Sequence, residues 1–225
     1  MRITHVITRL IIGGAQENTL SSVLGLRQKA GFEVPLISGP STGPEGSLES
    51  LDPQLLVVPS LVRPIAPWRD FMALRQLEQI FRASRPDIVH THSGKAGILG
   101  RLAAAKAGVP IIVHTIHGPS FGDFQNGLSN LLFRAAERRA GRVTTHFVTV
   151  ADAMTEQYLA AGIGRREQYT KIFSGFNLAP YLSAKNDPEL RAQLGIAPDD
   201  FVIGKIARLF KLKGHDDLVA VAPEI

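Results

Sequence analysis

Short apolar runs rich in β-branched residues alternate along this chain with stretches of helical periodicity, and this alternation restricts the possible folds more than any other feature. Strands are predicted at residues 2–8, 33–38, 55–58, 87–92, 111–116, 143–150 and 171–173. Helices are predicted at residues 16–30, 68–84, 94–107, 128–140 and 151–161. The apolar runs lack strict alternation with polar residues, which is typical of parallel strands that are buried on both faces. We therefore predict an α/β fold, a doubly wound parallel sheet with helices on both faces.

Two of the predicted helices differ in the side chains that they would bring to the sheet. Residues 68–84 place large apolar side chains on one face: Phe71, Leu74, Leu77, Ile80 and Phe81. Residues 94–107 are rich in alanine and glycine, so this helix could pack very close to the sheet.

The pattern changes after residue 178, so we expect the chain to divide there. Residues 1–178 are expected to form a Rossmann-like domain, and residues 179–200 a linker with one short helix. Residues 201–225 would be the first strand and helix of a truncated second domain. Asp187 and Gly195 are typical of the two ends of the linker's helix. The last part would form a strand at 201–207 and a helix at 214–222. One strand and one helix cannot bury their own apolar faces, so they either extend the first sheet or begin a second domain.

The composition restricts the chain's chemistry and its partners. The 225 residues include no cysteine, which excludes disulfides, thiolate metal sites and cysteine nucleophiles. No stretch reaches the ~20 apolar residues that a membrane-spanning helix needs, and the first residues lack a targeting signal, so we expect a cytoplasmic protein. The net charge of +5 suits an anionic partner such as a nucleotide diphosphate or a lipid surface. Nucleic acid is not expected as a partner, because no nucleic-acid-binding motif is found.

Ligands of doubly wound sheets bind at the carboxyl ends of the strands, so the loop after the first strand is a candidate site. It carries Gly13 and Gly14 directly before a helix, where the backbone could approach a phosphate group. An ordinary tight turn would explain the two glycines equally well. A dinucleotide site is not expected, because G-x-G-x-x-G is absent and the second strand ends at Ser38 rather than at an acidic residue.

Four histidines lie in or just after the fourth and fifth predicted strands: His90, His92, His114 and His117. A metal site is not expected there, because no cysteine or suitably placed carboxylate completes a ligand set. The histidines within the strands are interpreted as structural. His117 differs, because it follows its strand and precedes Gly118, where it could contact a sugar hydroxyl.

Two further loops carry polar side chains beside the start of a helix. Ser93 and Lys95 lie where the fourth strand ends, a place where polar groups meet ligands. Capping of the following helix by Ser93 is the alternative interpretation. Arg208 and Lys213 precede the last predicted helix and could clamp a diphosphate. A solvated basic turn is the alternative there.

The loop after the fifth strand also matches a serine-hydrolase motif. Residues 118–122 read G-x-S-x-G with Ser120 as the nucleophile, and His215 follows Asp199 or Asp200 in the order of a catalytic triad. The motif requires a helix that starts at the serine, whereas the glycine that ends the motif delays any helix. A serine hydrolase is therefore an alternative with less support.

The predicted helix at 128–140 is amphipathic and basic. Its apolar face and the arginines near it consist of Leu128, Leu131, Leu132 and Ala135, and of Arg134, Arg138, Arg139 and Arg142. Such a helix can lie on anionic lipid, although packing on the sheet is the more common use of an apolar face. Peripheral contact with the inner face of a membrane is therefore the second interpretation of this helix.

The loop motifs occur as one set over essentially the whole chain. Its members are Gly13-Gly14-Ala15-Gln16, His90-Thr91-His92-Ser93, Lys95 with Arg101, His114-Thr115-Ile116-His117-Gly118, and Arg208 with Lys213-Gly214. This set resembles retaining glycosyltransferase family 4, which has the two-domain GT-B fold. The resemblance implies a catalytic role for His117. It further implies donor diphosphate binding by Gly13, Gly14, Arg208 and Lys213, and an acceptor side formed by Gln16, His92, Ser93 and Lys95.

The resemblance also implies an activity, which is transfer of a sugar from a UDP- or GDP-linked donor to an acceptor hydroxyl with retention and without a metal or another cofactor. The acceptor would be a sugar or a lipid-linked sugar in surface polysaccharide or glycolipid assembly. The family's acidic E-x7-E segment is not found in these 225 residues. We therefore expect this chain alone to bind donor weakly and to turn over little. A non-catalytic sugar- or nucleotide-binding domain is the alternative from another class.

Overall fold

The computed structural model describes residues 1–175, 177–207, 209 and 213–224. The chain forms two compact units, Met1–Phe176 and Asn177–Ile225. The first unit holds the sheet, and the second holds three short helices.

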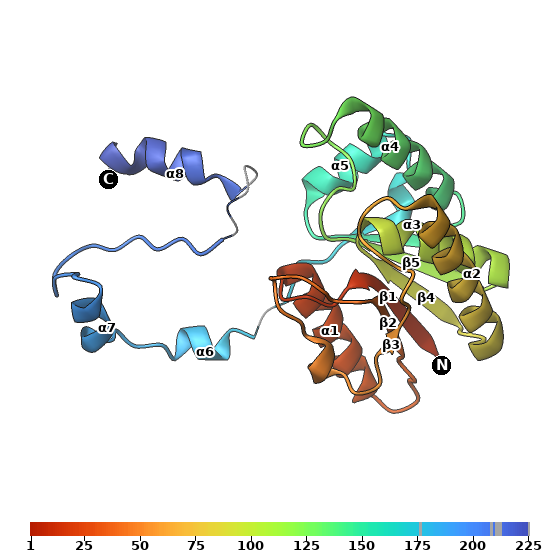
Figure 1. Cartoon of the computed structure of the whole chain (residues 1–225), viewed down its shortest axis with the longest axis horizontal. Helices are drawn as coiled ribbons and strands as arrows, with labels where there is room; N and C mark the ends of the chain where they lie inside the picture. The colour runs from red at the N-terminus through yellow and green to blue at the C-terminus, as the bar shows by residue number, and fades with distance from the viewer. Residues whose placement is uncertain (176, 208, 210–212, 225) are drawn as a thin grey trace. The chain divides into compact units, whose positions relative to one another are not determined.

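The first unit is built on a seven-stranded parallel sheet (Figure 1). Its strands are β1 (Ile3–Arg9), β2 (Leu36–Gly39), β3 (Leu56–Val57), β4 (Ile88–His92), β5 (Ile111–Ile116), β6 (His146–Thr149) and β7 (Tyr169–Lys171). Their order is β3-β2-β1-β4-β5-β6-β7, and every adjacent pair is parallel. The chain therefore winds outward in both directions from the boundary between β1 and β4. The predicted doubly wound sheet is confirmed.

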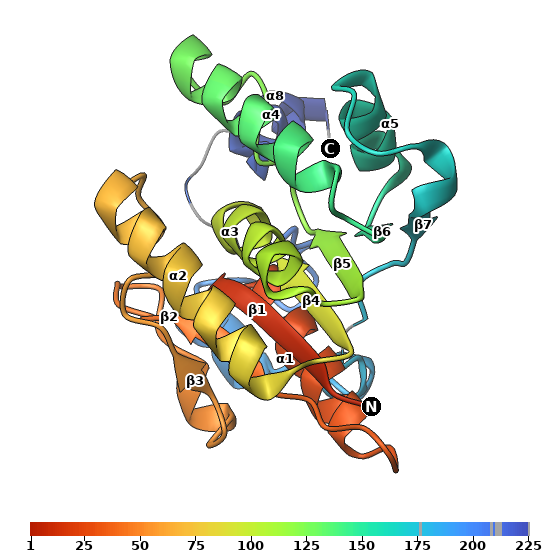
Figure 2. The same cartoon turned by 90° about the vertical axis from the view of Figure 1, so that its right-hand side faces the viewer.

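Helices pack on both faces of this sheet (Figure 2). They are α1 (Gly14–Arg27), α2 (Pro67–Ser84), α3 (Gly94–Ala107), α4 (Gly127–Gly141) and α5 (Asp152–Ala160), with short 3-10 helices at Glu49–Leu51 and Arg166–Gln168. Helix α1 packs Leu20 and Val23 against β1 and β2. On the opposite face, α2 and α3 bury apolar side chains against Val6 of β1 and Val89 of β4. Each of these clusters removes apolar area from water, which stabilises the fold by about 25 cal/mol for each Å² of area buried.

The first turn of α2 departs from its prediction. Leu77 and Phe81 are buried as the helical spacing predicts, but Phe71 is 53% exposed. Phe71 lies on the predicted apolar face, but periodicity identifies only a face of a helix, whereas burial also requires a neighbouring element beside that turn. Helix α3 does pack closely: a Cβ added to Gly97 would lie 2.4 Å from Cε1 of His114 on β5.

The second unit contains α6 (Ala179–Leu182), α7 (Pro188–Gln193), α8 (His215–Val221) and a 3-10 helix at Ala222–Glu224. Asp187 caps α7 as predicted, since its carboxylate accepts hydrogen bonds from the backbone of Glu189 and Leu190 at 3.0 and 3.1 Å. The predicted strand at 201–207 is wrong, because these residues form no regular structure. A strand needs a neighbour to complete its hydrogen bonds, and among the described residues none pairs with this stretch.

Candidate active site

The candidate site lies at the carboxyl ends of β1, β4 and β5, which are neighbours in the sheet. The glycine loop with Gly13 and Gly14 follows β1, His92 is the last residue of β4, and His117 follows β5. The winding direction reverses between β1 and β4, so the loops after these two strands leave the sheet on different sides. Such a switch point is where doubly wound sheets bind ligands.

The glycine loop leads directly into α1, with Gly13 at the N-cap position. A Cβ added to Gly14 would meet no atom within 4 Å, and one added to Gly13 would meet only the flexible side chain of Gln16. Neither glycine has the positive φ that other residues avoid. The fold itself therefore does not require these glycines, which supports the phosphate interpretation over an ordinary tight turn.

A chain of three hydrogen-bonded imidazoles runs from the protein interior to the site. Nδ1 of His5, on β1, lies 2.9 Å from Nε2 of His92, and Nδ1 of His92 lies 3.1 Å from Nε2 of His117. His5 and His92 are only 1% and 2% exposed, whereas His117 is half-buried. Our sequence reasoning missed His5, although its place opposite His90 in the parallel pairing of β1 and β4 was a usable signal.

Burial keeps the imidazoles of His5, His92 and His117, which form this histidine chain, uncharged. Loss of solvation lowers the pKa of His5 to about 4, with a smaller contribution from the positive charge of Arg27. Loss of solvation likewise lowers the pKa of His117 to about 4 and the pKa of His92 well below its usual value. At neutral pH each ring therefore has one N–H donor and one lone-pair acceptor.

His90 and His114 have structural roles, as predicted. Nε2 of His90 lies 2.7 Å from Oγ1 of Thr115, and Nδ1 of His114 lies 2.9 Å from Oγ1 of Thr91. His114 points toward α3, away from the histidine chain. Among the described residues, His5, His90 and His92 are the one group whose nitrogens converge as metal ligands do, within 4.8 Å of one another. The predicted absence of a metal stays a prediction.

Ser93 and Lys95 lie at the start of α3, and the structure corrects the capping interpretation. Ser93 occupies the N-cap position, but its side chain makes no capping bond, and its backbone has φ 65° and ψ 166°. This conformation costs a residue other than glycine of order 1–3 kcal/mol and is typical of functional sites. Nζ of Lys95 lies 2.5 Å from Oδ1 of Asp70 and also contacts the carbonyl of Pro64. The positive charge of Lys95 is therefore neutralised within the protein, and its acceptor role stays a prediction.

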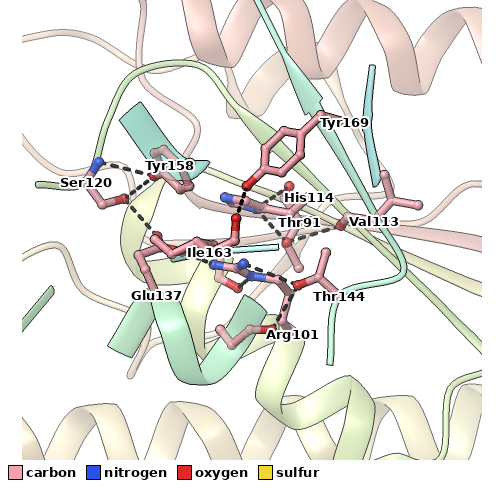
Figure 3. A network of polar contacts seen from close by, with 12 residues as sticks. Thr91, Arg101, Val113, His114, Ser120, Glu137, Thr144, Tyr158, Ile163 and Tyr169 are labelled. Atoms are coloured by element: carbon pink, nitrogen blue, oxygen red, sulfur yellow. Dashed lines mark hydrogen bonds and ion pairs between the residues drawn. The ribbon is translucent and has the colours of Figure 1, made fainter. Parts of the chain in front are cut away.

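The loop after His117 is held by a buried ionic network (Figure 3). Oγ of Ser120 donates to Oε1 of Glu137 at 3.0 Å and also lies 3.5 Å from the hydroxyl of Tyr158. The other carboxylate oxygen of Glu137 lies 2.5 Å from Nη2 of Arg101, and neither of these side chains is exposed. Arg101 also donates to the carbonyl of Gly97 on its own helix, at 2.7 Å.

The same contacts argue against a serine-hydrolase function. Within the first unit, Oγ of Ser120 is bonded to Glu137 and Tyr158, and Glu137 is already paired with Arg101. The helix after the motif starts at Gly127 rather than at the serine. Ser120 is therefore buried and lacks the exposed strand-to-helix turn that the motif requires.

The predicted donor clamp lies in the second unit. Lys213 is exposed, and Arg208 lies outside the described residues. Since each unit is a separate compact body, the joint role of Arg208 and Lys213 with the glycine loop stays a prediction.

Helix α4 has an unexpected exposed apolar face. Leu128, Leu131 and Leu132 are 69%, 65% and 52% exposed, so the prediction that they pack on the sheet is wrong. The helix is instead held through its last turns, where Glu137, Ala140 and Gly141 are buried. None of the described helices is long and apolar enough to cross a membrane.

Comparison with known proteins gives matches along most of the chain. Residues 13–172 match the glycosyl transferase 4-like domain. A UDP-Gal:alpha-D-GlcNAc-diphosphoundecaprenol alpha-1,3-galactosyltransferase of Escherichia coli is 31% identical over 219 residues, which cover 95% of this chain and 55% of that protein. An alpha-monoglucosyldiacylglycerol synthase of Acholeplasma laidlawii is 29% identical over 185 residues, which cover 75% of this chain and 46% of that protein. The chain thus spans about half the length of these curated relatives.

Solved structures share the fold. A glycosyltransferase from Rickettsia africae has a TM-score of 0.69 at 20% identity, over 99% of this chain and 57% of that one. A UDP co-structure of MnaA from S. aureus has a TM-score of 0.61 at 15% identity, over 86% of this chain and 51% of that one. The match to residues 13–172 includes the glycine loop and both site histidines. This chain belongs to the glycosyl transferase 4-like family.

Proposed function

We propose that the protein transfers a sugar from a nucleotide-sugar donor to an acceptor hydroxyl, with retention at the anomeric carbon. The observation that carries the proposal is the hydrogen-bonded pair of His92 and His117 at the switch point of the sheet, beside the open glycine loop. A helix N-terminus with accessible backbone N–H groups can bind a phosphate, and a neutral imidazole can hydrogen-bond to the hydroxyls of a sugar.

The proposed chemistry assigns a role to each group. The backbone of Gly13 and Gly14 would approach the donor diphosphate, and His117 would contact the transferred sugar. When the glycosidic bond breaks, negative charge grows on the leaving diphosphate, and the cations of Arg208 and Lys213 would stabilise that charge without a metal. Gln16, His92, Ser93 and Lys95 would form the acceptor side.

We propose a lipid-linked or sugar acceptor and a role in surface polysaccharide or glycolipid assembly. The names of two relatives support this choice, since one acts on a diphosphoundecaprenol-linked sugar and the other makes a glucosyldiacylglycerol. An acceptor of this kind lies in a membrane, so the protein would work at the cytoplasmic surface of that membrane.

We further propose that two exposed apolar clusters contact the membrane surface. One lies at the start of α2 and includes Trp68 and Phe71, which are 72% and 53% exposed. The other is the exposed face of α4 described above, with Leu131 at its centre. Crossover helices run opposite to parallel strands, so the starts of both helices lie at the same edge of the sheet as the site (Figure 2). Exposed arginines beside both clusters would add attraction to anionic lipid.

The membrane proposal is tested by sedimentation with vesicles that contain phosphatidylglycerol. We expect Leu131→Glu to lower the bound fraction severalfold, because a carboxylate in the apolar face must be desolvated at the bilayer. Leu190→Glu is the matched control, since this leucine is 50% exposed on α7 in the other unit. Equal binding by the two variants would contradict the proposal.

The donor proposal is tested by calorimetric titration with UDP and GDP in the presence of a chelator. We expect weak binding by the 225-residue chain and an affinity at least about tenfold lower, or ~1.4 kcal/mol, for Gly14→Leu, because the new side chain fills the space beside the backbone. Gly25→Leu is the control, since Gly25 lies on the same helix and is also open. We expect Arg208→Ala with Lys213→Ala to weaken binding as well.

Three outcomes would change the assignment. Equal affinities of wild type and Gly14→Leu would remove the glycine loop from the donor site. A requirement for Mg²⁺ would contradict the role of the two cations. Sugar or nucleotide binding by the protein without any transfer to an acceptor would favour a non-catalytic binding domain.

A further inference from the structure

The histidine chain has a direction that its hydrogen bonds alone do not reveal. His92 uses both ring nitrogens, one toward His5 and one toward His117. Because a neutral imidazole has one donor and one acceptor, His92 must accept from one neighbour and donate to the other. Only two arrangements of protons are therefore consistent with the three rings.

The two arrangements differ at the ends of the chain. If His5 donates from Nδ1, its buried Nε2 carries an unused lone pair. His92 then donates from its own Nδ1 to Nε2 of His117, so His117 carries its proton on Nδ1. If His5 accepts at Nδ1, its Nε2 is a buried N–H, and Nδ1 of His117 is a lone pair. Nε2 of His5 is buried without a hydrogen-bond partner among the described residues. An orphaned buried N–H is rarer in proteins than an under-used acceptor, so the first arrangement is favoured.

We propose that buried His5 is a positioning residue that acts through His92 to fix the tautomer of His117, so that His117 presents an Nδ1–H donor to the bound ligand. A role of this donor in sugar transfer rests on the proposed function. Two adjacent strands transmit the effect, because His5 lies on β1 and His92 on β4. No other hydrogen bond is formed by the ring of His117 within the described part of the chain, so its Nδ1 is available.

The proposal decides what kind of ligand atom His117 meets. An Nδ1–H donor binds an acceptor oxygen, such as a sugar hydroxyl oxygen or a phosphate oxygen. The same nitrogen cannot remove a proton from an attacking hydroxyl, because its lone pair is committed to the N–H bond. His117 would therefore stabilise developing negative charge rather than act as a general base.

A metal ion is the competing use of the same rings. Nitrogens of His5, His90 and His92 lie close enough to bind one. In the histidine chain, however, both ring nitrogens of His92 are hydrogen-bonded, one to His5 and one to His117, so His92 has no nitrogen left to bind a metal. Binding of a metal by these rings and the hydrogen bonds of the histidine chain therefore exclude each other. One experiment distinguishes the two.

The test is the long-range ¹H–¹⁵N spectrum of the ¹⁵N-histidine-labelled 225-residue chain at pH 7, which reports the protonated nitrogen of each ring. For wild type we expect protonated Nδ1 and unprotonated Nε2 at both His92 and His117. The measurement needs no donor or acceptor, so its failure is separate from failure of the proposed transferase function.

Variants at the buried end test the direction of control. We expect His5→Leu to release His117 to a mixture that contains the Nε2–H tautomer, because the donor to His92 is lost. His5→Asn should restore the wild-type pattern, since its amide N–H can occupy the position of Nδ1. His90→Phe is the matched control, because the ring of His90 lies 4.3 Å from the ring of His92 on the same sheet face but is not part of the histidine chain.

Several results would overturn the proposal. One is an Nε2–H tautomer of His117 in the wild type, a measurement that does not depend on whether any variant folds. Another is an unchanged His117 in a His5→Leu variant whose amide spectrum shows the native fold. A third is loss of the His5 and His92 ring signals on addition of stoichiometric Zn²⁺, which would show that the rings form a metal site instead.

Discussion

Two buried polar networks lie on opposite faces of β4 and β5, and they differ in charge. On the α3 side, Arg101 and Glu137 form a fully buried ion pair that also holds Ser120 (Figure 3). On the other side, the chain from His5 through His92 to His117 is uncharged, because burial lowers the pKa of each ring. One network is ionic and closed, and the other is neutral and ends at the site.

This difference follows from the free energy of burying polar groups. A buried charge is tolerated only when its partners are complete, so the groups of the ionic network are committed to one another. A neutral imidazole costs less to bury, and the histidine chain can therefore leave one nitrogen of His117 without a protein partner. We infer that the ionic network is structural, whereas the neutral chain is available for a ligand.

The largest expected effect comes from breaking the ionic network. Glu137→Ala should lower the free energy of unfolding by about 3–5 kcal/mol, because it leaves the Arg101 guanidinium buried without its counter-ion. Urea unfolding at pH 7 measures this change. Glu156→Ala removes an exposed partner of Arg166 and should change the free energy of unfolding little, because solvent screens that pair.

A double variant tests whether this loss of stability comes from an unpaired buried charge. Arg101→Leu combined with Glu137→Leu should recover much of the lost stability, because replacing both charges avoids the unpaired one. Additive losses in the double variant would contradict the view that the cost arises from an uncompensated charge.

The second effect concerns the neutral network and appears on acidification. Folding lowers the pKa of His5 from 6.5 to about 4, so below pH 6.5 the unfolded chain binds more protons than the folded chain. The stability contributed by this neutral histidine is complete above pH 6.5 and falls as the pH drops toward 4, by roughly 3 kcal/mol for His5 alone. Denaturant titrations between pH 7 and 4.5 measure the loss, and His117 adds to it in the same window.

The pH prediction has its own control. The His5→Leu variant should show a shallower loss over the same range, because one titrating group is removed. Carboxyl groups with a lowered pKa, such as Glu33 and Glu156, lose their contribution only below their ordinary value of 4.5. Stability that stays constant from pH 7 to 4.5 would show that the histidine chain is not buried in solution.

The smallest effect tests the link between the ionic network and the site. Ser120→Ala removes a hydroxyl that donates to Glu137 and should cost roughly 1.5–3 kcal/mol, as expected for a hydrogen bond to a charged group. Ser22→Ala is the control, since that hydroxyl bonds only to a carbonyl of its own helix. A phosphonate probe should leave Ser120 unlabelled, and labelling there would restore the hydrolase interpretation.

Local sequence signals predicted most elements but not all of their environments. The bounds of α3 and β5 agree with the predicted residues, because a glycine follows α3 and an uninterrupted apolar run forms β5. The strand expected at 201–207 did not form, because a strand depends on a partner elsewhere in the chain. Phe71 and Leu131 belong to apolar helix faces that the sequence predicted, yet both are exposed, because periodicity does not identify what lies against a face.

For the site, the sequence was sufficient to predict which residue types follow or end the strands: the glycine pair after β1, the histidine at the end of β4 and the histidine after β5. The folded structure was needed to show that His5 is hydrogen-bonded to the histidine at the end of β4 and that Lys95 is paired with Asp70. It also showed that Ser120 is bonded to Glu137 rather than to a histidine. The succession of strands and helices follows from local alternation along the chain, whereas the protons and charges of a site depend on contacts between residues that the sequence separates by 17 to 87 positions.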